Sequence, residues 1–440
     1  MPAKRNLSAV LIYFIYDLLI TFIYCFAVIK WSVKKGLTRD PWVHKRAERY
    51  GIINFSGRRV DYWFHCVSVG EVVAASCVIK VLLADNADTK ILVTTTTPTG
   101  AQRLHDIFAG QVVHHYLPYD LPWLMHSFIK TIRPKRCLVT EVELWPNMIR
   151  QCAKADIPVL ILNARMTERS AQRYQKLSAL FTPMLANISH VMAQGERDHQ
   201  AYRYLGMPEE KLTLTHNIKF DQLSNINVPE KVQQFAQQVS ERFVLIAGST
   251  HDQEERHWLD VQAGLGIDES LLCIVPRHPE RFAVVASLLD EQDIPYITWT
   301  QWQATPELLT AQIEVVLVDA MGVLTPLYSC ADVAFVGGSI NNRGGHNALE
   351  PAYFGVPVIM GPHQHNNPVI CAKLAEVEAL HTTHNVEQSV ALVDTWYAQP
   401  ELKQTHGQAG QRVLSTNQGA LARSLEVIAQ YLEPDTTSPD

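Results

Sequence analysis

An acidic residue lies at the first turn between a predicted strand and a predicted helix. The run DYWFHCVSV predicts the strand and GEVVAASCVIKVLLA the helix, which places Ser68 and Glu71 at the turn. Ser followed three residues later by Glu is typical of a capping box, and the residues alone favour that interpretation. The alternative is chemical, because a carboxylate at the carboxyl end of a strand could act as a general base on a hydroxyl group. The helix terminus is expected to keep Glu71 ionised, and therefore a weak base.

A second group of charged residues follows the run CLVT. Glu141 and Glu143 are two residues apart, so strand alternation points both side chains to one face. Neighbouring carboxylates repel each other, and one of them titrates high unless a cation lies near. Lys219, in the run HNIKFD, could be that cation. The simpler alternative is a solvated surface lysine, with one solvated glutamate and one glutamate at a helix start.

Glycine pairs and an arginine mark the second half of the chain. Gly337-Gly338-Ser339 follows the run DVAFV, and Gly344-Gly345-His346-Asn347 is expected to open the next helix, on which Asn347 and Glu350 share a face. Such glycines allow backbone amides to approach an anion, although a plain glycine turn fits as well. Arg277, after the run LLCIVP, could bind a phosphate in a bidentate manner or be a solvated charge.

The elements that would position these residues alternate along the chain. From Val60 onward, short apolar runs are followed by helical patterns, and the series restarts after a polar stretch near 223–238. Alternation of this kind predicts parallel sheets with right-handed crossovers. We therefore expect an α/β protein with two doubly wound, Rossmann-like domains and a cleft between them. Ligands would lie at the carboxyl ends of the strands.

The N-terminus predicts a membrane anchor. Residues 7–29 are an apolar stretch with one charge, Asp17, long enough as a helix to cross a hydrocarbon core. Because a charge near the middle of the hydrocarbon is costly, a shallow or tilted placement of this helix in the membrane is an alternative. Seven basic residues against two acidic ones between Lys30 and Arg49 predict that the body of the protein stays in the cytoplasm. A cleaved signal peptide would usually have a shorter apolar region.

Length and composition narrow the possible classes of function. The 440 residues suit two domains, and the net charge of −6 gives no indication of a nucleic-acid partner. The eight cysteines include no CxxC pair, which is typical of free thiols in a reducing compartment. We assign residues 1–35 to the anchor and its basic flank, 36–225 to the first domain and 226–435 to the second.

Taken together, these motifs resemble the Kdo (3-deoxy-D-manno-octulosonic acid) transferase family of lipid A biosynthesis, which has the two-domain GT-B glycosyltransferase fold. The matching runs occur in order between about residues 60 and 370 and are WFHCVSVGEVVAA, VTTTTPTG, TEVELWPNMI, LNARMTERS, HNIKFD, AGST with a following EE, VPRHPERF, VDAMG, GGSINNRGGHNALEP and GPHQHNN. The chain departs from the family at Val323, where Glu is usual, and at His216, where Gly is usual. A backbone contact at Val323 would survive this change, whereas a carboxylate contact would not.

The resemblance implies an activity. The protein would transfer Kdo from CMP-Kdo to the lipid A precursor lipid IV(A) at the cytoplasmic face of the bacterial inner membrane, in lipopolysaccharide core biosynthesis. The reaction would invert the anomeric centre and need neither a metal nor a cofactor, since CMP-Kdo is itself the donor substrate. The alternatives are another GT-B enzyme that uses a UDP-sugar, either a transferase or an epimerase, and a non-catalytic, membrane-tethered scaffold.

The resemblance also implies roles for particular residues. Glu71 would be the base that deprotonates the acceptor hydroxyl in the first domain, and Glu141 and Lys219 would stabilise the transition state. The residues that would hold CMP in the second domain are Pro276, Arg277, Met321, Gly322, Val323, Asn347, Ala348, Leu349 and Glu350.

Overall fold

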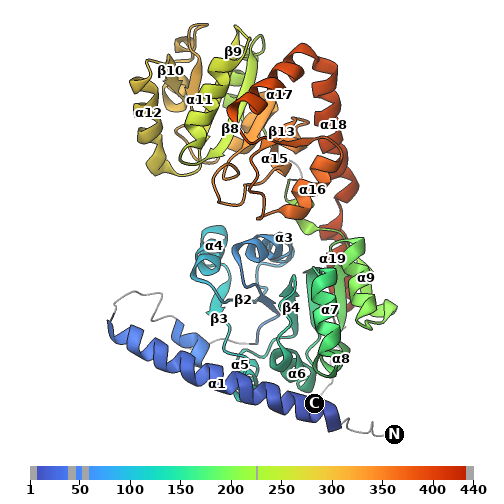
Figure 1. Cartoon of the computed structure of the whole chain (residues 1–440). Coiled ribbons are helices and arrows are strands. Elements are labelled where there is room, and N and C mark those ends of the chain that lie inside the picture. The colour runs from blue at the N-terminus through green and yellow to red at the C-terminus, as the bar shows by residue number, and fades with distance from the viewer. Residues whose placement is uncertain (1–6, 38–45, 52–58, 224–225, 433–440) are drawn as a thin grey trace. The chain divides into compact units, whose positions relative to one another are not determined.

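The computed structural model describes residues 7–37, 46–51, 59–223 and 226–432 (Figure 1). It has two compact units, Met1–Gln222 with Gln418–Asp440, and Leu223–Asn417. Each unit contains one seven-stranded sheet with parallel pairing throughout, which confirms the doubly wound α/β architecture. Residues 38–45 of the basic flank and residues 224–225 of the polar stretch lie outside the described residues.

The first sheet has the strand order β3-β2-β1-β4-β5-β6-β7. Its strands are β1 (Tyr62–His65), β2 (Ile91–Thr95), β3 (Val113–Tyr116), β4 (Arg136–Thr140), β5 (Val159–Ala164), β6 (His190–Ala193) and β7 (Leu212–Leu214). The chain builds outward from β1 to β3 and then returns to place β4 on the other side of β1. The topological switch point therefore lies between β1 and β4, and ligands of doubly wound sheets bind beyond the carboxyl ends of the strands at such a point.

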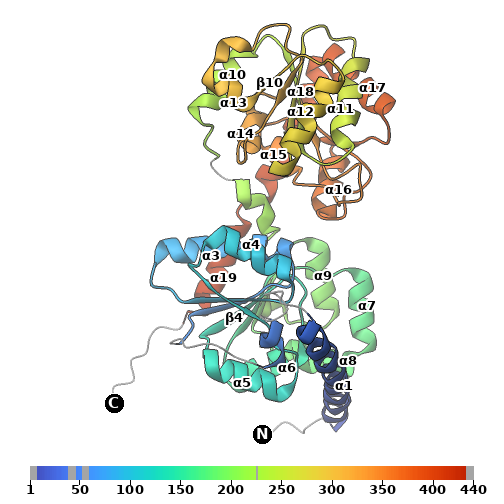
Figure 2. The same cartoon turned by 90° about the vertical axis from the view of Figure 1, so that its left-hand side faces the viewer.

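Helices cover both faces of the first sheet (Figures 1 and 2). Those before the final segment are α1 (Leu7–Leu37), α3 (Val69–Asp85), α4 (Pro98–Phe108), α5 (Pro122–Ile132), α6 (Pro146–Lys154), α7 (Glu168–Lys176), α8 (Ser178–Ala186) and α9 (Glu196–Tyr204), with short 3-10 turns η1 (Arg46–Tyr50), η2 (Glu209–Lys211) and η3 (Ile218–Leu223). One apolar cluster lies under α5, α6, α8 and α9, and a second lies under α3 and α4. This two-sided burial explains why β1, β2, β4, β5 and β6 are buried along their whole length.

The final helix, α19 (Ala420–Gln430), belongs to the first unit. Its residues Ala420, Val427 and Ile428 are buried in the same cluster as α3 and α4. Asp221 holds its start, because the Asp221 carboxylate accepts hydrogen bonds from the amides of Gly419 and Leu421 at 2.7 and 2.5 Å. The assignment of residues up to 435 to the second domain therefore differs from the structure, in which residues 418–432 group with the first unit.

The second sheet has the order β10-β11-β9-β8-β12-β13-β14. Its strands are β8 (Phe243–Thr250), β9 (Ser270–Pro276), β10 (Tyr296–Thr298), β11 (Val315–Leu317), β12 (Val333–Val336), β13 (Val358–Met360) and β14 (Leu380–Thr382). Here β8 lies between β9 and β12, so the switch point lies between β8 and β12.

The helices of the second unit again lie on two faces, over two apolar clusters. They are α10 (Glu230–Gln238), α11 (Glu254–Gly264), α12 (Phe282–Glu291), α13 (Trp299–Ala304), α14 (Leu324–Leu327), α15 (Leu349–Tyr353), α16 (Pro368–Glu376), α17 (Val386–Ala398) and α18 (Pro400–Asn417), with short turns η4 (Pro279–Arg281), η5 (Pro306–Leu308) and η6 (Tyr328–Cys330).

The helix α1 contains the apolar stretch predicted from the sequence. Its residues Leu11–Lys30 have a mean hydropathy of 2.2 and are mostly exposed, so α1 is long and apolar enough to cross a membrane by length and composition. Within the described ranges, the structure therefore contains one exposed apolar helix of this kind, at the N-terminus of the first unit.

The packing of α19 predicts that the end of the chain stabilises the first unit. Ile428→Ala should lower the free energy of unfolding of the first unit by about 2–5 kcal/mol, because it opens a cavity in a buried cluster. Hydrogen exchange of the β1–β7 amides in the full chain measures this. The control Gln430→Ala, on the exposed side of α19, should change exchange little. Faster exchange confined to β8–β14 would show that α19 does not support the first sheet.

Candidate active site

Glu71 lies at the switch point of the first sheet, in the first turn of α3 after β1. Ser68 is the N-cap of α3, and its side chain accepts a hydrogen bond from the Glu71 amide at 3.4 Å. The Glu71 carboxylate in turn accepts hydrogen bonds from the Val67 amide and from the Ser68 hydroxyl, the latter at 3.3 Å. The N-cap at Ser68 is thus present, and the Glu71 carboxylate beside it is buried, with 7% of its surface exposed.

The ionisation of Glu71 differs from the prediction. Burial raises the pKa of its carboxyl to about 8, helped by the charges of Glu141 and Glu143 and opposed by the hydrogen bonds from Val67 and Ser68. The helix terminus was expected to keep this group ionised, but the loss of solvent and two neighbouring carboxylates outweigh it. Glu71 is therefore a stronger base than the sequence indicated, and its pKa lies in the range useful for proton transfer near neutral pH.

Glu141 comes from the adjacent strand, directly after β4, and pairs with Lys219. The distance between the Lys219 Nζ and a Glu141 carboxylate oxygen is 3.6 Å, and both side chains are mostly buried, at 17% and 16% exposed. Glu141 has φ +61, a left-handed conformation that side chains rarely adopt. Glu143 accepts a hydrogen bond from the Trp145 indole at 3.0 Å, and burial raises the pKa of its carboxyl. The structure thus brings the predicted carboxylates and Lys219 together.

Lys219 is positioned by the loop that carries it. Buried Asn163 accepts a hydrogen bond from the Ile218 amide at 3.1 Å, and Asn217 accepts one from the Lys219 amide at 3.1 Å. A Cβ atom at Gly70 would lie 3.6 Å from the Lys219 Nζ, so the amine also reaches the first turn of α3. The same 3-10 turn contains Asp221, which accepts hydrogen bonds from amides at the start of α19, so the turn that carries Lys219 is attached to the returning helix.

His216, one of the two departures from the family pattern, has an unusual backbone conformation. It has φ +67, in the left-handed region that glycine adopts without steric cost. The resemblance implies glycine at this position, and the backbone conformation of His216 is one that glycine would adopt readily.

The predicted CMP-binding residues lie on three neighbouring segments of the second unit. Arg277 directly follows β9, its amide donates a hydrogen bond to the Thr250 carbonyl at 3.0 Å, and its side chain is exposed. Met321, Gly322 and Val323 precede α14, with Met321 exposed and Gly322 at φ +82. Val323 packs partly against the apolar cluster beneath it, so a side chain of this kind offers no polar contact to a ligand.

Glu350 links two of these segments. Its carboxylate accepts hydrogen bonds from the Thr325 hydroxyl at 2.8 Å and from the Asn347 side-chain amide at 3.3 Å. Burial raises the pKa of the Glu350 carboxyl, while these two hydrogen bonds and the charge of Arg277 lower it. Ala348 and Leu349 are fully buried. The helix α15 begins at Leu349, so Asn347 precedes the helix on which it was predicted to lie.

The first glycine pair has a different role from the predicted one. The buried carboxylate of Glu254 accepts hydrogen bonds from the amides of Gly338, Ser339 and Ile340 at 2.8–3.0 Å, and from the His251 amide at 2.9 Å. The anion that these amides approach is therefore part of the protein. A Cβ atom at Gly337 would lie 2.2 Å from the Ser249 carbonyl oxygen, so this glycine allows the close approach of β8 and β12.

Two further groups near the second switch point were not singled out from the sequence. Glu255 forms a bidentate ion pair with Arg281, at 2.9 and 3.0 Å, and accepts a hydrogen bond from the Thr250 hydroxyl. His251 and His346 are stacked with 2.9 Å between their Nε2 atoms, and burial lowers the pKa of both imidazoles to about 4, with further lowering by Arg277. In the sequence, this ion pair could have been found from the second Glu of the EE that follows AGST and from the second Arg of VPRHPERF, which are Glu255 and Arg281.

Comparison with known proteins agrees with this architecture. The family model described as 3-Deoxy-D-manno-octulosonic-acid transferase (kdotransferase) matches residues 44–222. The 3-deoxy-D-manno-octulosonic acid transferase of Haemophilus influenzae is 40% identical over 402 residues, which are 90% of this chain and 93% of that protein.

Two solved structures are also similar. The C-terminal CMP-Kdo binding domain of WaaA from Acinetobacter baumannii is 30% identical over 42% of this chain and 97% of its own, with a TM-score of 0.39. A glycosyltransferase from Rickettsia africae covers 86% of this chain and 100% of its own at a TM-score of 0.51 and 14% identity, a likeness of fold alone. The identity to the Haemophilus enzyme, which extends over nine tenths of the chain, shows that this protein belongs to the Kdo transferases, a family of glycosyltransferases with the GT-B fold.

Proposed function

We propose that this protein transfers Kdo from CMP-Kdo to the lipid A precursor lipid IV(A), at the cytoplasmic face of the bacterial inner membrane, in lipopolysaccharide core biosynthesis. The observation that carries the mechanism is the buried carboxylate of Glu71, whose pKa is raised to about 8 at the switch point of the first sheet. Membership of the Kdo transferase family supports the donor and the acceptor.

In this proposal Glu71 is the general base of an inverting displacement. The acceptor oxygen forms a bond to the anomeric carbon of Kdo, and its proton passes to the Glu71 carboxylate. The bond between the anomeric carbon and the phosphate oxygen breaks, and its electron pair leaves with CMP. The reaction needs no metal in this scheme. A carboxylate with a raised pKa suits this step, because its basicity is close to the working pH.

Lys219 and Glu141 are proposed to stabilise the transition state beside Glu71. The ion pair of 3.6 Å holds the lysine amine beside Glu141, within reach of the first turn of α3. A fixed positive charge in a site with little solvent stabilises developing negative charge more strongly than water does.

The second unit is proposed to bind the donor. Arg277 would contact the phosphate of CMP, and the segment Met321, Gly322 and Val323, of which the first two residues are exposed, would contact the rest of the nucleotide together with Pro276. Asn347, Ala348, Leu349 and Glu350 would close the site, with Glu350 accepting hydrogen bonds from sugar hydroxyls. The hydrogen bonds from Thr325 and Asn347 support this role because they fix the orientation of the Glu350 carboxylate.

The N-terminal helix supports a location at the membrane. We propose that α1 attaches the enzyme to the inner membrane, where the acyl chains of the acceptor are held, and that the basic residues after Ile29 keep the catalytic body on the cytoplasmic side.

The first test of this mechanism is Glu71→Gln, which keeps the size of the side chain but removes the base. Transfer should fall by about 10²–10⁴-fold, the usual contribution of general base catalysis. Binding of CMP, measured by calorimetry, should remain within about twofold, because the donor residues lie in the second unit. If CMP binding fell as far as turnover, the role of Glu71 would be structural.

The pH dependence of kcat/KM provides a second test. At pH 7 about one tenth of Glu71 would be ionised, so the rate should rise with pH and level off above about pH 8. Because the charge of Glu143 raises the pKa of Glu71, Glu143→Gln should move this acid limb to lower pH. The control Asp106→Asn, at an exposed carboxylate on α4, should leave the limb in place. A limb that stays in place in Glu143→Gln would mean that another group titrates.

A further inference from the structure

The helix α1 contacts the first unit along one face. Its partly buried residues recur every three or four positions from Ile12 to Val28, and Tyr13 is buried. Figures 1 and 2 show α1 alongside this unit, next to α8. The span from Tyr13 to Ala27 is about 21 Å long at the rise of an α-helix, so the contact is continuous over several turns.

Polar contacts hold this face in place. The Asp17 carboxylate accepts a hydrogen bond from the Asn147 side chain at 2.7 Å and forms an ion pair with Arg150 at 3.3 Å. The Tyr16 hydroxyl donates to Asp120 at 2.8 Å. The single charge of the apolar stretch, which appeared costly from the sequence, is therefore paired with the first unit.

Further along the helix, tyrosines make the contact. The Tyr24 hydroxyl donates to the Tyr50 carbonyl at 3.3 Å, and the Tyr50 hydroxyl donates to the Ala27 carbonyl at 3.1 Å. The rings of Tyr24 and Tyr119 also meet edge to face, with centroids 5.9 Å apart. Both halves of α1 are thus attached to the unit.

The opposite face of α1 is apolar. Ten large apolar residues between Leu11 and Val33 are exposed, among them Phe14, Leu18, Phe22 and Phe26 at 63–74%. An apolar surface of this extent indicates contact with a membrane or another protein. Since the only acidic residue of the stretch is turned toward the first unit, the exposed face is suited to hydrocarbon.

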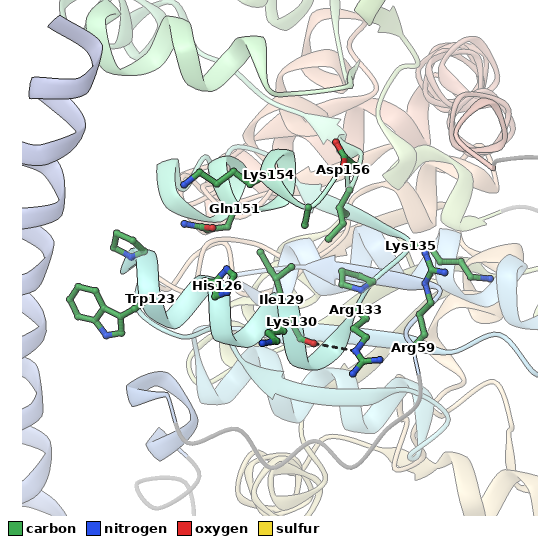
Figure 3. Close-up of a pocket in the computed structure, with 14 residues that line it drawn as sticks. Arg59, Trp123, His126, Ile129, Lys130, Arg133, Lys135, Gln151, Lys154 and Asp156 are labelled. Atoms are coloured by element: carbon green, nitrogen blue, oxygen red, sulfur yellow. Dashed lines mark hydrogen bonds between the residues drawn. The ribbon is translucent and has the colours of Figure 1, made fainter. Parts of the chain in front are cut away.

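A basic groove on the first unit, whose Trp123 end lies toward α1, favours a lipid surface. A groove between α5 and α6 is lined by Arg59, Lys130, Arg133, Lys135 and Lys154, and Asp156 adds an acidic group to this lining (Figure 3). The groove begins close to α1, because α5 starts two residues after Asp120, which Tyr16 contacts. Trp123, at that end of the groove, is half exposed. Basic residues and a tryptophan of this kind suit the anionic headgroup region of a bilayer.

We propose that α1 lies in the plane of the membrane surface, docked on the first unit through Asp17, and does not cross the bilayer. A crossing helix would have to carry Asp120, Asn147 and Arg150 into the hydrocarbon, or leave them and place Asp17 there unpaired. In the docked arrangement both ends of α1 stay on the side of the catalytic body. This inference rests on the proposed membrane location but not on the proposed reaction.

The test is the position of the N-terminus in spheroplasts of a Gram-negative host. Full-length protein carrying Ala3→Cys and Cys25→Ser is exposed to a membrane-impermeant maleimide; the remaining cysteines are buried or half-buried. We expect no labelling of intact spheroplasts and full labelling after lysis. Labelling of intact spheroplasts would overturn the inference, because the N-terminus would then lie in the periplasm.

A matched pair of variants tests whether lipid covers the exposed face. Leu18→Asp places a carboxylate on that face and should reduce co-flotation of the purified protein with phosphatidylglycerol-containing vesicles at least tenfold. Ile20→Asp, on the half-buried side, serves as the comparison and should reduce it less. Equal effects, or flotation unaffected by Leu18→Asp, would contradict a lipid-facing surface, as would a stable complex with protein in place of vesicle binding. Transfer to detergent-dispersed acceptor is measured in parallel, so that a wrong orientation of α1 is distinguished from a wrong function.

Discussion

The first unit depends on keeping acidic groups together at one edge of a sheet with little solvent. Glu71, Glu141 and Glu143 follow neighbouring strands, and their mutual repulsion adds to the cost of burial. Lys219 offsets part of this cost through its ion pair with Glu141. The part of this cost that Lys219 does not offset raises the pKa of Glu71. The scaffold must therefore hold these groups against their repulsion, and the cap at Ser68, the buried Asn163 and the contact of Asp221 with α19 all do so.

The second unit also buries neighbouring carboxylates, but there hydrogen-bond donors of the protein satisfy them. Two adjacent carboxylates at the start of α11, Glu254 and Glu255, are buried, and both are fully engaged by hydrogen-bond donors. Glu254 fixes the loop after β12, and Glu255 holds Arg281 in the segment after β9. These segments carry the proposed donor residues, so their backbone is positioned before any ligand arrives. Such preorganisation lowers the free energy that binding must spend on ordering loops.

The sequence predicted the parts of the structure that depend on local pattern. Alternation of strands and helices indicated two parallel sheets, and the position of Glu71 at a strand end followed from the same pattern. Its ionisation could not be predicted, because it depends on burial and on Glu141 and Glu143, which are distant in sequence. Likewise, the glycine amides after β12 suggested an anion, but only the fold shows that Glu254 is that anion. The return of α19 and the pairing of Asp17 with Arg150 join residues more than a hundred positions apart, beyond the reach of any local pattern.

The central claim is that this protein moves Kdo from its CMP-activated form to a lipid acceptor. The most direct measurement incubates the detergent-solubilised full chain with a tetraacylated lipid A precursor and CMP-Kdo generated in place, followed by mass spectrometry of the lipid. We predict that the lipid gains the mass of one or more Kdo residues, and that it gains no mass when UDP-sugars replace CMP-Kdo. An unchanged lipid, with donor synthesis verified by an established Kdo transferase in a parallel reaction, would contradict the claim.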